Sequence, residues 1–238
     1  MKFKISLFLV VILVVTLFIG AKAYNENSFL AYTVDTKKQD LKLYWKNENG
    51  QAFSSIQNLK LWIEKKNLTL YFAMNAGMYK KDHSPQGLYI EKQKTLSPLD
   101  TTKAVGNFYL KPNGVFYLTT ENVAEICTTE RFRDNKKVKY ATQSGPMLLI
   151  DGKIHPDFKE GSANLNIRNG VGILPDGKVV FVLSKNEVNF YDFASYFKSL
   201  GCKNALYLDG FVSRAYLPSQ NWIQTDGDFG VLFAVVRK

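Results

Sequence analysis

The sequence is poor in the two residue types that most often bind transition metals or activate a nucleophile. Its 238 residues include only two cysteines, Cys127 and Cys202, and two histidines, His83 and His155. Neither histidine stands at metal-ligand spacing from a cysteine, and a two-metal phosphodiesterase would need a larger cluster of carboxylates and histidines. In an oxidising compartment the cysteines could form one disulfide, and two buried free thiols fit the sequence nearly as well.

Positive charge is in excess, but it is not concentrated in a stripe. The formal charge is +10 at pH 7, which suits a protein that meets anionic partners such as wall polymers, phosphosugars or lipid headgroups. The one dense basic run, residues 131–139, is more typical of a solvated loop than of a binding surface. Because basic residues do not alternate with aromatic ones, no nucleic-acid partner is expected.

No hydrophobic run is long enough to cross a bilayer comfortably. Lys2 and Lys4 precede an apolar run from Ile5 to Gly20, and Ala21-Lys22-Ala23 follows it. This order is typical of a secretory signal peptide, and the run is shorter than the roughly 20 residues of a membrane span. We therefore expect a signal peptide over 1–23 and one exported, periplasmic or extracellular domain over 24–238, with no stable membrane span after cleavage. An uncleaved N-terminal anchor is the alternative.

Hydrophobic periodicity predicts more strands than helices, without internal repeats. Amphipathic spacing predicts helices over 55–66 and 191–200. Strands are expected at 29–35, 41–46, 68–74, 87–91, 107–110, 115–119, 147–150, 170–174, 178–184, 205–209, 215–217 and 230–236. Hairpins are expected over 29–46, 107–119 and 170–184. The expected fold class is α+β: one large mixed, mostly antiparallel sheet flanked by a few helices in a single domain.

Polar residues and glycines follow two of the expected strands. Asp209 ends the strand 205–209, and Gly210 allows the chain to turn without a Cβ clash. Asn75 and Gly77 follow the strand 68–74, where the amide of Asn75 can both donate and accept hydrogen bonds. Each pair is also what an ordinary tight turn contains, so neither motif indicates a site on its own.

Two further clusters add a hydroxyl and a guanidinium. Ser144 and Gly145 precede Pro146, but the pattern is not the Gly-x-Ser-x-Gly turn and no histidine stands nearby, which favours a positioning role over a nucleophile. Arg168 and Asn169 open the strand 170–174. A planar guanidinium there suits bidentate contact with a phosphate or carboxylate, and an internal salt bridge is the alternative.

Five motifs, in this order, resemble the phosphodiester glycosidase domain family, which contains the mammalian mannose 6-phosphate uncovering enzyme. They span most of the chain between residues 68 and 217 and read Asn75-Ala76-Gly77-Met78-Tyr79, Pro85-Gln86-Gly87-Leu88-Tyr89-Ile90, Ser144-Gly145-Pro146-Met147, Arg168-Asn169-Gly170-Val171-Gly172 and Leu206-Tyr207-Leu208-Asp209-Gly210. Many members carry Asp-Gly-Gly-Gly-Ser-Ser where this chain has Asp209-Gly210-Phe211-Val212-Ser213-Arg214. The chain therefore looks like a bacterial exported subgroup.

The resemblance implies a hydrolase that cleaves the glycosidic C1–O bond of a sugar-1-phosphodiester and releases a sugar and a phosphomonoester. The substrate would belong to cell-surface or extracellular glycoconjugates, such as exopolysaccharide. In this interpretation Arg168 holds the phosphate, and Asp209 acts as base, nucleophile or electrostatic stabiliser. Glu91 is the expected second catalytic carboxylate, with an ordinary surface charge as the equal alternative.

The implied partner is a phosphorylated carbohydrate or another anionic glycan. The expected substrate-binding residues are Asn75, Gly77, Ser144, Gly145, Asn169, Gly210 and Ser213. No cofactor or metal-ligand set is evident, and a divalent cation held by scattered oxygens stays open. The rival interpretation is a non-catalytic exported protein that binds glycans or wall polymers through aromatic residues such as Tyr44, Trp45 and Trp222, although such residues more often pack within sheets.

Overall fold

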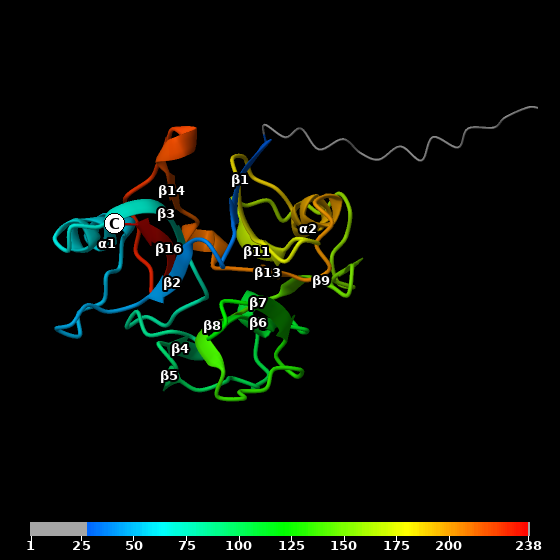
Figure 1. Cartoon of the computed structure of the whole chain (residues 1–238). Coiled ribbons are helices and arrows are strands. Elements are labelled where there is room, and N and C mark those ends of the chain that lie inside the picture. Colours follow the sequence, from blue (N-terminus) through cyan, green and yellow to red (C-terminus); the bar gives the residue numbers. More distant parts are fainter. Residues whose placement is uncertain (1–27, 238) are drawn as a thin grey trace, which may run out of the picture.

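The computed structural model describes residues 28–237, which form a single domain (Figure 1). The expected signal peptide over 1–23, and with it the alternative of an N-terminal anchor, lies outside these residues. Within the described part of the chain, no helix is both long enough and apolar enough to cross a membrane.

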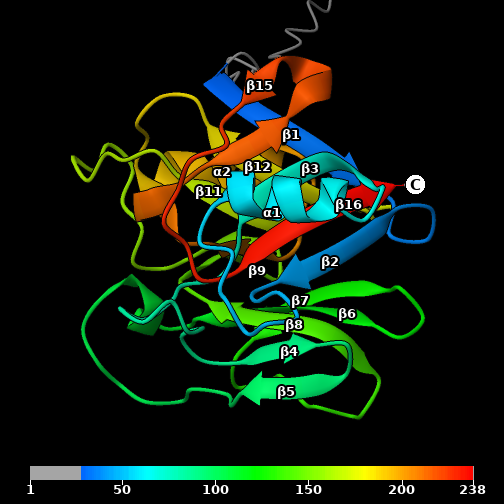
Figure 2. The ribbon, with the colours of Figure 1, turned by 90° about the vertical axis from the view of Figure 1, so that its left-hand side faces the viewer.

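Residues 28–237 form three antiparallel sheets (Figures 1 and 2). The first has the order β1-β12-β11-β13-β9-β10 and consists of β1 (Phe29–Val34), β9 (Met147–Ile150), β10 (Lys153–Ile154), β11 (Asn169–Ile173), β12 (Val179–Ser184) and β13 (Ala205–Tyr207). The second has the order β15-β14-β3-β16-β2 and consists of β2 (Asp40–Tyr44), β3 (Thr69–Asn75), β14 (Ala215–Leu217), β15 (Trp222–Ile223) and β16 (Leu232–Arg237). The third has the order β5-β4-β8-β6-β7 and consists of β4 (Tyr89–Glu91), β5 (Lys94–Ser97), β6 (Gly114–Thr119), β7 (Ala124–Thr128) and β8 (Val138–Ser144).

One apolar core joins the three sheets. Phe72 of β3, Phe116 of β6 and Phe181 of β12 are all buried in it, and Phe233 of β16 packs edge-on against Phe116 with ring centroids 5.1 Å apart. Fully burying a side chain of this size stabilises a fold by roughly 1.5–3 kcal/mol. The shared core therefore fixes the sheets relative to one another, and with them the strand ends that carry the polar motifs.

The helices α1 (Ile56–Glu64) and α2 (Phe190–Ser199) lie where the hydrophobic periodicity predicts them. Ser55 caps α1 and Asn189 caps α2, each by accepting a backbone N–H three residues further along the chain. α1 packs its apolar side on the second sheet and α2 on the first, so the helices lie on opposite outer sides of the molecule (Figure 1). Short 3₁₀ turns occur at η2 (Asn107–Tyr109), η3 (Gly210–Val212) and η4 (Pro218–Gln220).

The predicted fold class and two of the predicted hairpins need correction. The fold is mostly β, with three sheets in place of one large mixed sheet. β1 pairs with β12 and β2 with β16, so 29–46 is not a hairpin. The segment 107–110 is the turn η2, and β6 pairs instead with β7 and β8, which the periodicity did not reveal. The hairpin of β11 and β12 is confirmed.

The two cysteines are free thiols. Cys202 is buried beneath α2, and Cys127 is half-buried on β7. Burial raises the pKa of Cys202 to about 12 and that of Cys127 to about 11. Neither thiol is therefore a ready thiolate nucleophile at neutral pH.

Candidate active site

Strand ends from two sheets meet at the turn that carries Asp209. β3 ends at Asn75, β11 begins at Asn169, and β13 ends two residues before Asp209. The backbone N–H of Leu208 donates to Asn169 O at 3.1 Å, and that of Asp209 donates to Ala76 O at 3.2 Å. The first bond lies within the first sheet, and the second joins it to the end of β3 in the second sheet, so the position of Asp209 is set by both sheets.

Two buried amides hold this turn in place. Asn169 Nδ2 donates to Asn75 O at 2.9 Å and to Asn75 Oδ1 at 3.0 Å. Asn75 Nδ2 donates to Asp209 O at 2.7 Å, and Asn75 Oδ1 accepts the backbone N–H of Arg214 at 2.9 Å. Ser213 Oγ lies 3.3 Å from Asn169 Oδ1. The three expected substrate-binding residues Asn75, Asn169 and Ser213 thus come together, and their polar groups are engaged with the protein itself.

Arg168 is enclosed within the protein beside this network. Its side chain is 1% exposed, and the guanidinium lies 3.6 Å from the ring centroid of Phe190. Nε donates to Val188 O at 2.8 Å, Nη2 to Asn164 O at 2.9 Å and Nη1 to the hydroxyl of Tyr207 at 3.3 Å. No carboxylate of residues 28–237 lies within ion-pair distance, and burial lowers the pKa of Arg168 from its usual value.

These contacts change the role expected for Arg168. A guanidinium that holds a phosphate must offer unpaired N–H groups to the ligand, whereas most donors of Arg168 are already bonded to the protein. The hydroxyl that it reaches, that of Tyr207, lies directly against Gly210. Arg168 therefore supports the turn at Asp209 from the protein interior, through Tyr207. It does not line the cavity into which Asp209 opens.

Gly210 is the position at which this support is tightest. A Cβ added there would lie 1.7 Å from the hydroxyl oxygen of Tyr207, far inside van der Waals contact. Any larger residue must displace Tyr207, and with it the bond to Arg168. The Asp-Gly pair thus has a physical cause: the carboxylate needs a rigid turn, and the turn lies directly on a buried tyrosine.

Asp209 itself opens into a surface cavity of about 440 Å³. Burial raises the pKa of its half-buried carboxyl group to about 6, and the nearby backbone N–H of Phe211 opposes this shift. The exposed Lys80 and Lys81 lie on the same wall, and neither has an ion-pair partner among residues 28–237. The cavity therefore combines a carboxylate that ionises near neutral pH with positive charge suited to an anion.

Three wall residues of this cavity were not identified as site residues from the sequence. His83 Nε2 lies 2.5 Å from Asp228 Oδ1, and the Tyr79 hydroxyl donates to the backbone oxygen of Asp228. The rings of Tyr79 and His83 stack with centroids 5.6 Å apart. Burial and the charges of Asp209 and Asp228 raise the pKa of Tyr79 to about 12. Only Tyr79 belongs to a motif; the pairing of His83 with Asp228 spans 145 residues and leaves no local signal.

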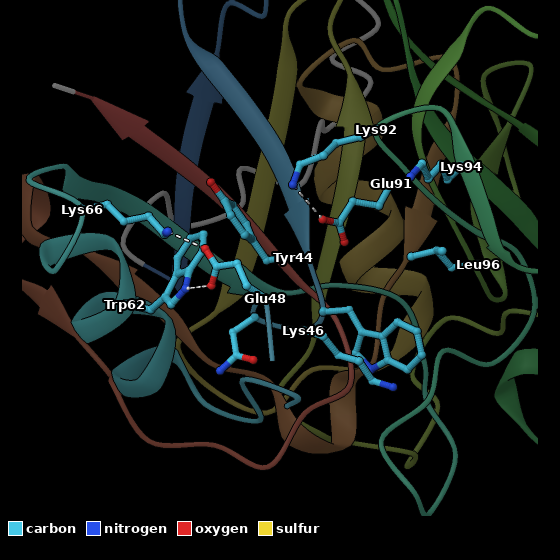
Figure 3. Close-up of a pocket in the computed structure, with 11 residues that line it drawn as sticks. Tyr44, Lys46, Glu48, Trp62, Lys66, Glu91, Lys92, Lys94 and Leu96 are labelled. Carbon is cyan, nitrogen blue, oxygen red and sulfur yellow. Dashed lines mark hydrogen bonds and ion pairs between the residues drawn. The ribbon is translucent and has the colours of Figure 1, made fainter. Parts of the chain in front are cut away.

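Glu91 lies in a different cavity from Asp209 (Figure 3). Its carboxylate accepts the hydroxyl of Tyr89 at 2.9 Å and lies 3.6 Å from Lys92 Nζ. The second carboxylate that shares the cavity with Asp209 is Asp228. We therefore correct the expected pairing of Glu91 with Asp209: the short strand that ends at Glu91 lies in the third sheet, not at the junction of the first and second.

The remaining predicted residues, Gly77, Ser144 and Gly145, are closely packed against neighbouring segments of the chain. A Cβ at Gly77 would lie 2.5 Å from Gln143 O, and one at Gly145 would lie 2.9 Å from Phe108 O. Ser144 is fully buried, and its Oγ has no hydrogen-bond partner among residues 28–237. Within the same residues, no three His, Cys, Asp or Glu side chains are grouped as metal ligands.

Comparison with known proteins identifies relatives of this chain. The phosphodiester glycosidase family model matches residues 69–231. The uncharacterized protein YigE of Escherichia coli (strain K12) is 40% identical over 188 residues, which are 79% of this chain and 73% of that protein.

Solved structures share the fold at low sequence identity. The catalytic domain of zebrafish N-acetylglucosamine-1-phosphodiester alpha-N-acetylglucosaminidase, auto-inhibited by its pro-peptide, is 13% identical with a TM-score of 0.60, over 90% of this chain and 85% of that one. A protein of Burkholderia pseudomallei K96243, whose name marks it as a candidate exported protein, is 10% identical with a TM-score of 0.56, over 87% of this chain and 73% of that one. Because the family match covers well over half of the residues, the chain belongs to the phosphodiester glycosidase family.

Proposed function

We propose that this protein is an exported hydrolase that breaks the C1–O bond of a sugar-1-phosphodiester in the cavity beside Asp209. The observation that carries the proposal is the half-buried Asp209, with its pKa raised to about 6, on a cavity wall that it shares with Lys80 and Lys81. Membership of the family supports the reaction class. The products would be a free sugar and a phosphomonoester.

The reaction follows from the groups on the cavity wall. The C1–O bond breaks, its electron pair stays on the phosphate oxygen, and the phosphomonoester leaves. Such a leaving group needs less protonation than an alkoxide, so no strong general acid is required. A water molecule adds to C1 and gives its proton to the Asp209 carboxylate, which passes it to solvent. Lys80 and Lys81 offset the charge that develops on the phosphate.

The buried network acts on this reaction through position alone. Asn75 and Asn169 fix the backbone at Asp209, and Arg168 fixes it through Tyr207. When the groups that hold a catalytic carboxylate are themselves fixed by packing, the carboxylate keeps its productive orientation. We therefore propose Asp209 as the catalytic residue and Arg168, Asn75 and Asn169 as positioning residues.

Product analysis on a panel of α- and β-linked sugar-1-phosphodiesters tests this proposal. The kcat/KM of the wild-type protein is expected to rise with pH through about 6 and then level off, because Asp209 must be ionised to accept a proton. Asp209→Asn should abolish turnover. The matched control is Asp134→Asn, at an exposed turn, and it should keep wild-type rates.

Three results would contradict the proposal. Release of a sugar phosphate would show cleavage of the P–O bond instead. Undiminished turnover by Asp209→Asn would remove the carboxylate from the mechanism. Binding of the whole panel without release of any sugar would identify a non-catalytic glycan-binding protein.

A further inference from the structure

A second cavity, of about 640 Å³, lies between the end of β2, helix α1 and the edge of the third sheet (Figure 3). We call it the tryptophan groove and define it by Trp45, Lys46, Trp62, Lys66, Lys94 and Leu96. We propose that the tryptophan groove binds a stretch of an acidic polysaccharide, a glycan chain that carries carboxylate or phosphate groups. This binding does not depend on the hydrolysis proposed above.

The first observation is a pair of indole rings that the protein holds in place. Trp45 Nε1 donates to His83 O at 2.8 Å, and Trp62 Nε1 donates to a Glu48 carboxylate oxygen at 2.8 Å. Both rings are partly exposed, and beside them Leu96 is 49% exposed. Aromatic rings that are fixed at a wet surface present flat apolar area at little cost in conformational entropy, which suits the C–H faces of sugar rings.

The second observation is the charge of the walls. Four lysines line the cavity against two glutamates. Lys66 pairs with Glu48, and Lys92 lies 3.6 Å from Glu91, as the dashed lines in Figure 3 show. The other two lysines, Lys46 and Lys94, have no such ion-pair partner among residues 28–237. A groove for neutral sugars would need no such excess of positive charge, whereas an acidic glycan supplies the missing anions.

Of the four lysines that line this cavity, Lys46 and Lys94 have no ion-pair partner among residues 28–237. Lys46 Nζ lies 3.9 Å from the ring centroid of Trp45, and Lys66 Nζ lies 4.4 Å from that of Trp62. Each of these ammonium groups therefore lies over the face of an indole ring. A bound acidic sugar unit can draw the ammonium group onto its own anion and place its ring on the indole face that is uncovered.

The third observation is the extent of the surface. Trp62 and Asn47 also line a neighbouring cavity of about 430 Å³, which adds Lys65. Two adjoining hollows that share a tryptophan fit a chain better than a single sugar. In addition, the hydrogen bond from Trp45 to His83 joins the wall of the groove to the wall of the Asp209 cavity. A bound chain is thus kept near Asp209, a consequence that does rest on the proposed function.

Binding of the purified protein to immobilised polymers, measured by biolayer interferometry, tests the inference. Alginate and polygalacturonate supply carboxylates, phosphorylated dextran supplies phosphates on a sugar chain, unmodified dextran is the neutral glycan, and inorganic polyphosphate is the anion without sugar. At least one acidic glycan should bind about tenfold more tightly than both dextran and polyphosphate. The inference is overturned if none does.

Variants then locate the site. Lys46→Glu with Lys94→Glu should weaken binding to the acidic glycan about tenfold or more, because two attractive contacts become repulsive. The control, Lys153→Glu with Lys185→Glu, makes the same change in net charge at exposed positions elsewhere and should change affinity less than about twofold. An equal loss in both double variants would show general charge attraction and overturn the proposed site.

The outcome is distinguishable from that of the hydrolysis proposal. With a small soluble sugar-1-phosphodiester, the Lys46→Glu/Lys94→Glu variant should keep the kcat/KM of the wild-type protein. If no variant hydrolyses any substrate and the acidic glycan still binds, only the proposed reaction fails. If hydrolysis is seen and the double variant binds the glycan as the wild-type protein does, only the tryptophan groove fails.

Discussion

Asp209→Asn is expected to make the protein more stable at neutral pH. Burial raises the pKa of Asp209 from the usual 3.8 to about 6, so the charged carboxylate is disfavoured in the folded chain relative to the unfolded chain. Each pH unit of this shift corresponds to about 1.4 kcal/mol, and the ionised side chain therefore lowers the free energy of unfolding by about 3 kcal/mol. Asparagine has nearly the same shape without the charge and removes this cost.

The sign of the effect fixes its dependence on pH. The folded chain binds the proton of Asp209 more tightly than the unfolded chain does, so this group makes wild-type stability fall as pH rises from about 4 to about 6. The gain in unfolding free energy of Asp209→Asn should be about 3 kcal/mol at pH 8 and about half as large at pH 5.

Urea unfolding at the two pH values, with Asp134→Asn as the exposed control, measures the effect. The control should stay within about 0.5 kcal/mol of the wild-type protein at both pH values. A variant that is less stable than the wild-type protein at pH 8, or a gain that does not shrink at pH 5, would refute the argument. It would mean that burial does not disfavour the carboxylate, and the proposed base would lose its physical basis.

Three other substitutions probe the same site. Arg168→Lys replaces a planar guanidinium with a compact ammonium group, whose three N–H groups on one nitrogen cannot reach the widely spaced acceptors that Nε, Nη1 and Nη2 contact; we expect kcat to fall with KM little changed, whereas a rise in KM alone would indicate direct contact with substrate. Gly210→Ala forces a Cβ to within 1.7 Å of the Tyr207 hydroxyl and should lower the unfolding free energy by about 1–3 kcal/mol in urea; a neutral result would contradict the described packing. Phe211 is 93% exposed at the rim of the Asp209 cavity, so Phe211→Ser should leave stability unchanged within about 0.5 kcal/mol. Steady-state kinetics should show kcat/KM roughly 2- to 10-fold lower if the ring packs on the substrate, and an unchanged value would exclude that contact.

The features that the sequence predicts well are local ones. The apolar spacing that predicts α1 and α2 is contained within each short segment of the chain. The hairpin of β11 and β12 follows from the turn Pro175-Asp176-Gly177 between two apolar runs. In each case the atoms that decide the structure are neighbours in the chain.

Strand partners are decided by the shared core, and the sequence does not reveal them. Alternating residues indicate that 29–34 is a strand, but its partner, β12, is about 150 residues further along the chain. β8 was missed for a related reason: its polar Gln143 is fully buried, with Oε1 accepting the backbone N–H groups of Leu88 and Asp100, both at 2.9 Å. A polar residue that is satisfied by distant backbone interrupts the apolar pattern that marks a buried strand.

In the candidate site as well, the sequence predicts some features, and distant contacts decide the others. The order of motifs along strand ends led us to expect that Asn75, Arg168 and Asp209 gather around one anion-accepting cavity. Asn75 bonds to the backbone of Asp209, but of the three only Asp209 lines the cavity. Their roles, and that of Ser144, stay predictions. The sequence could not tell which way the guanidinium of Arg168 points, because that direction depends on Phe190, 22 residues further along the chain, which covers it. Nor does the sequence indicate that Asp228 shares the cavity with Asp209.

The motif residues mainly build the turn, and other residues line the cavity. Asn75 and Asn169 use their polar groups to hold the backbone around Asp209. Gly210 has no side chain and so fits against Tyr207 at the same turn. Lys80 and Phe211, which face the cavity, carry no such structural task. The fold itself is kept at 13% sequence identity to the zebrafish domain. On this argument, exchanging residues of the cavity wall should alter which sugar phosphodiester is preferred, whereas exchanging motif residues should lower turnover of all of them alike.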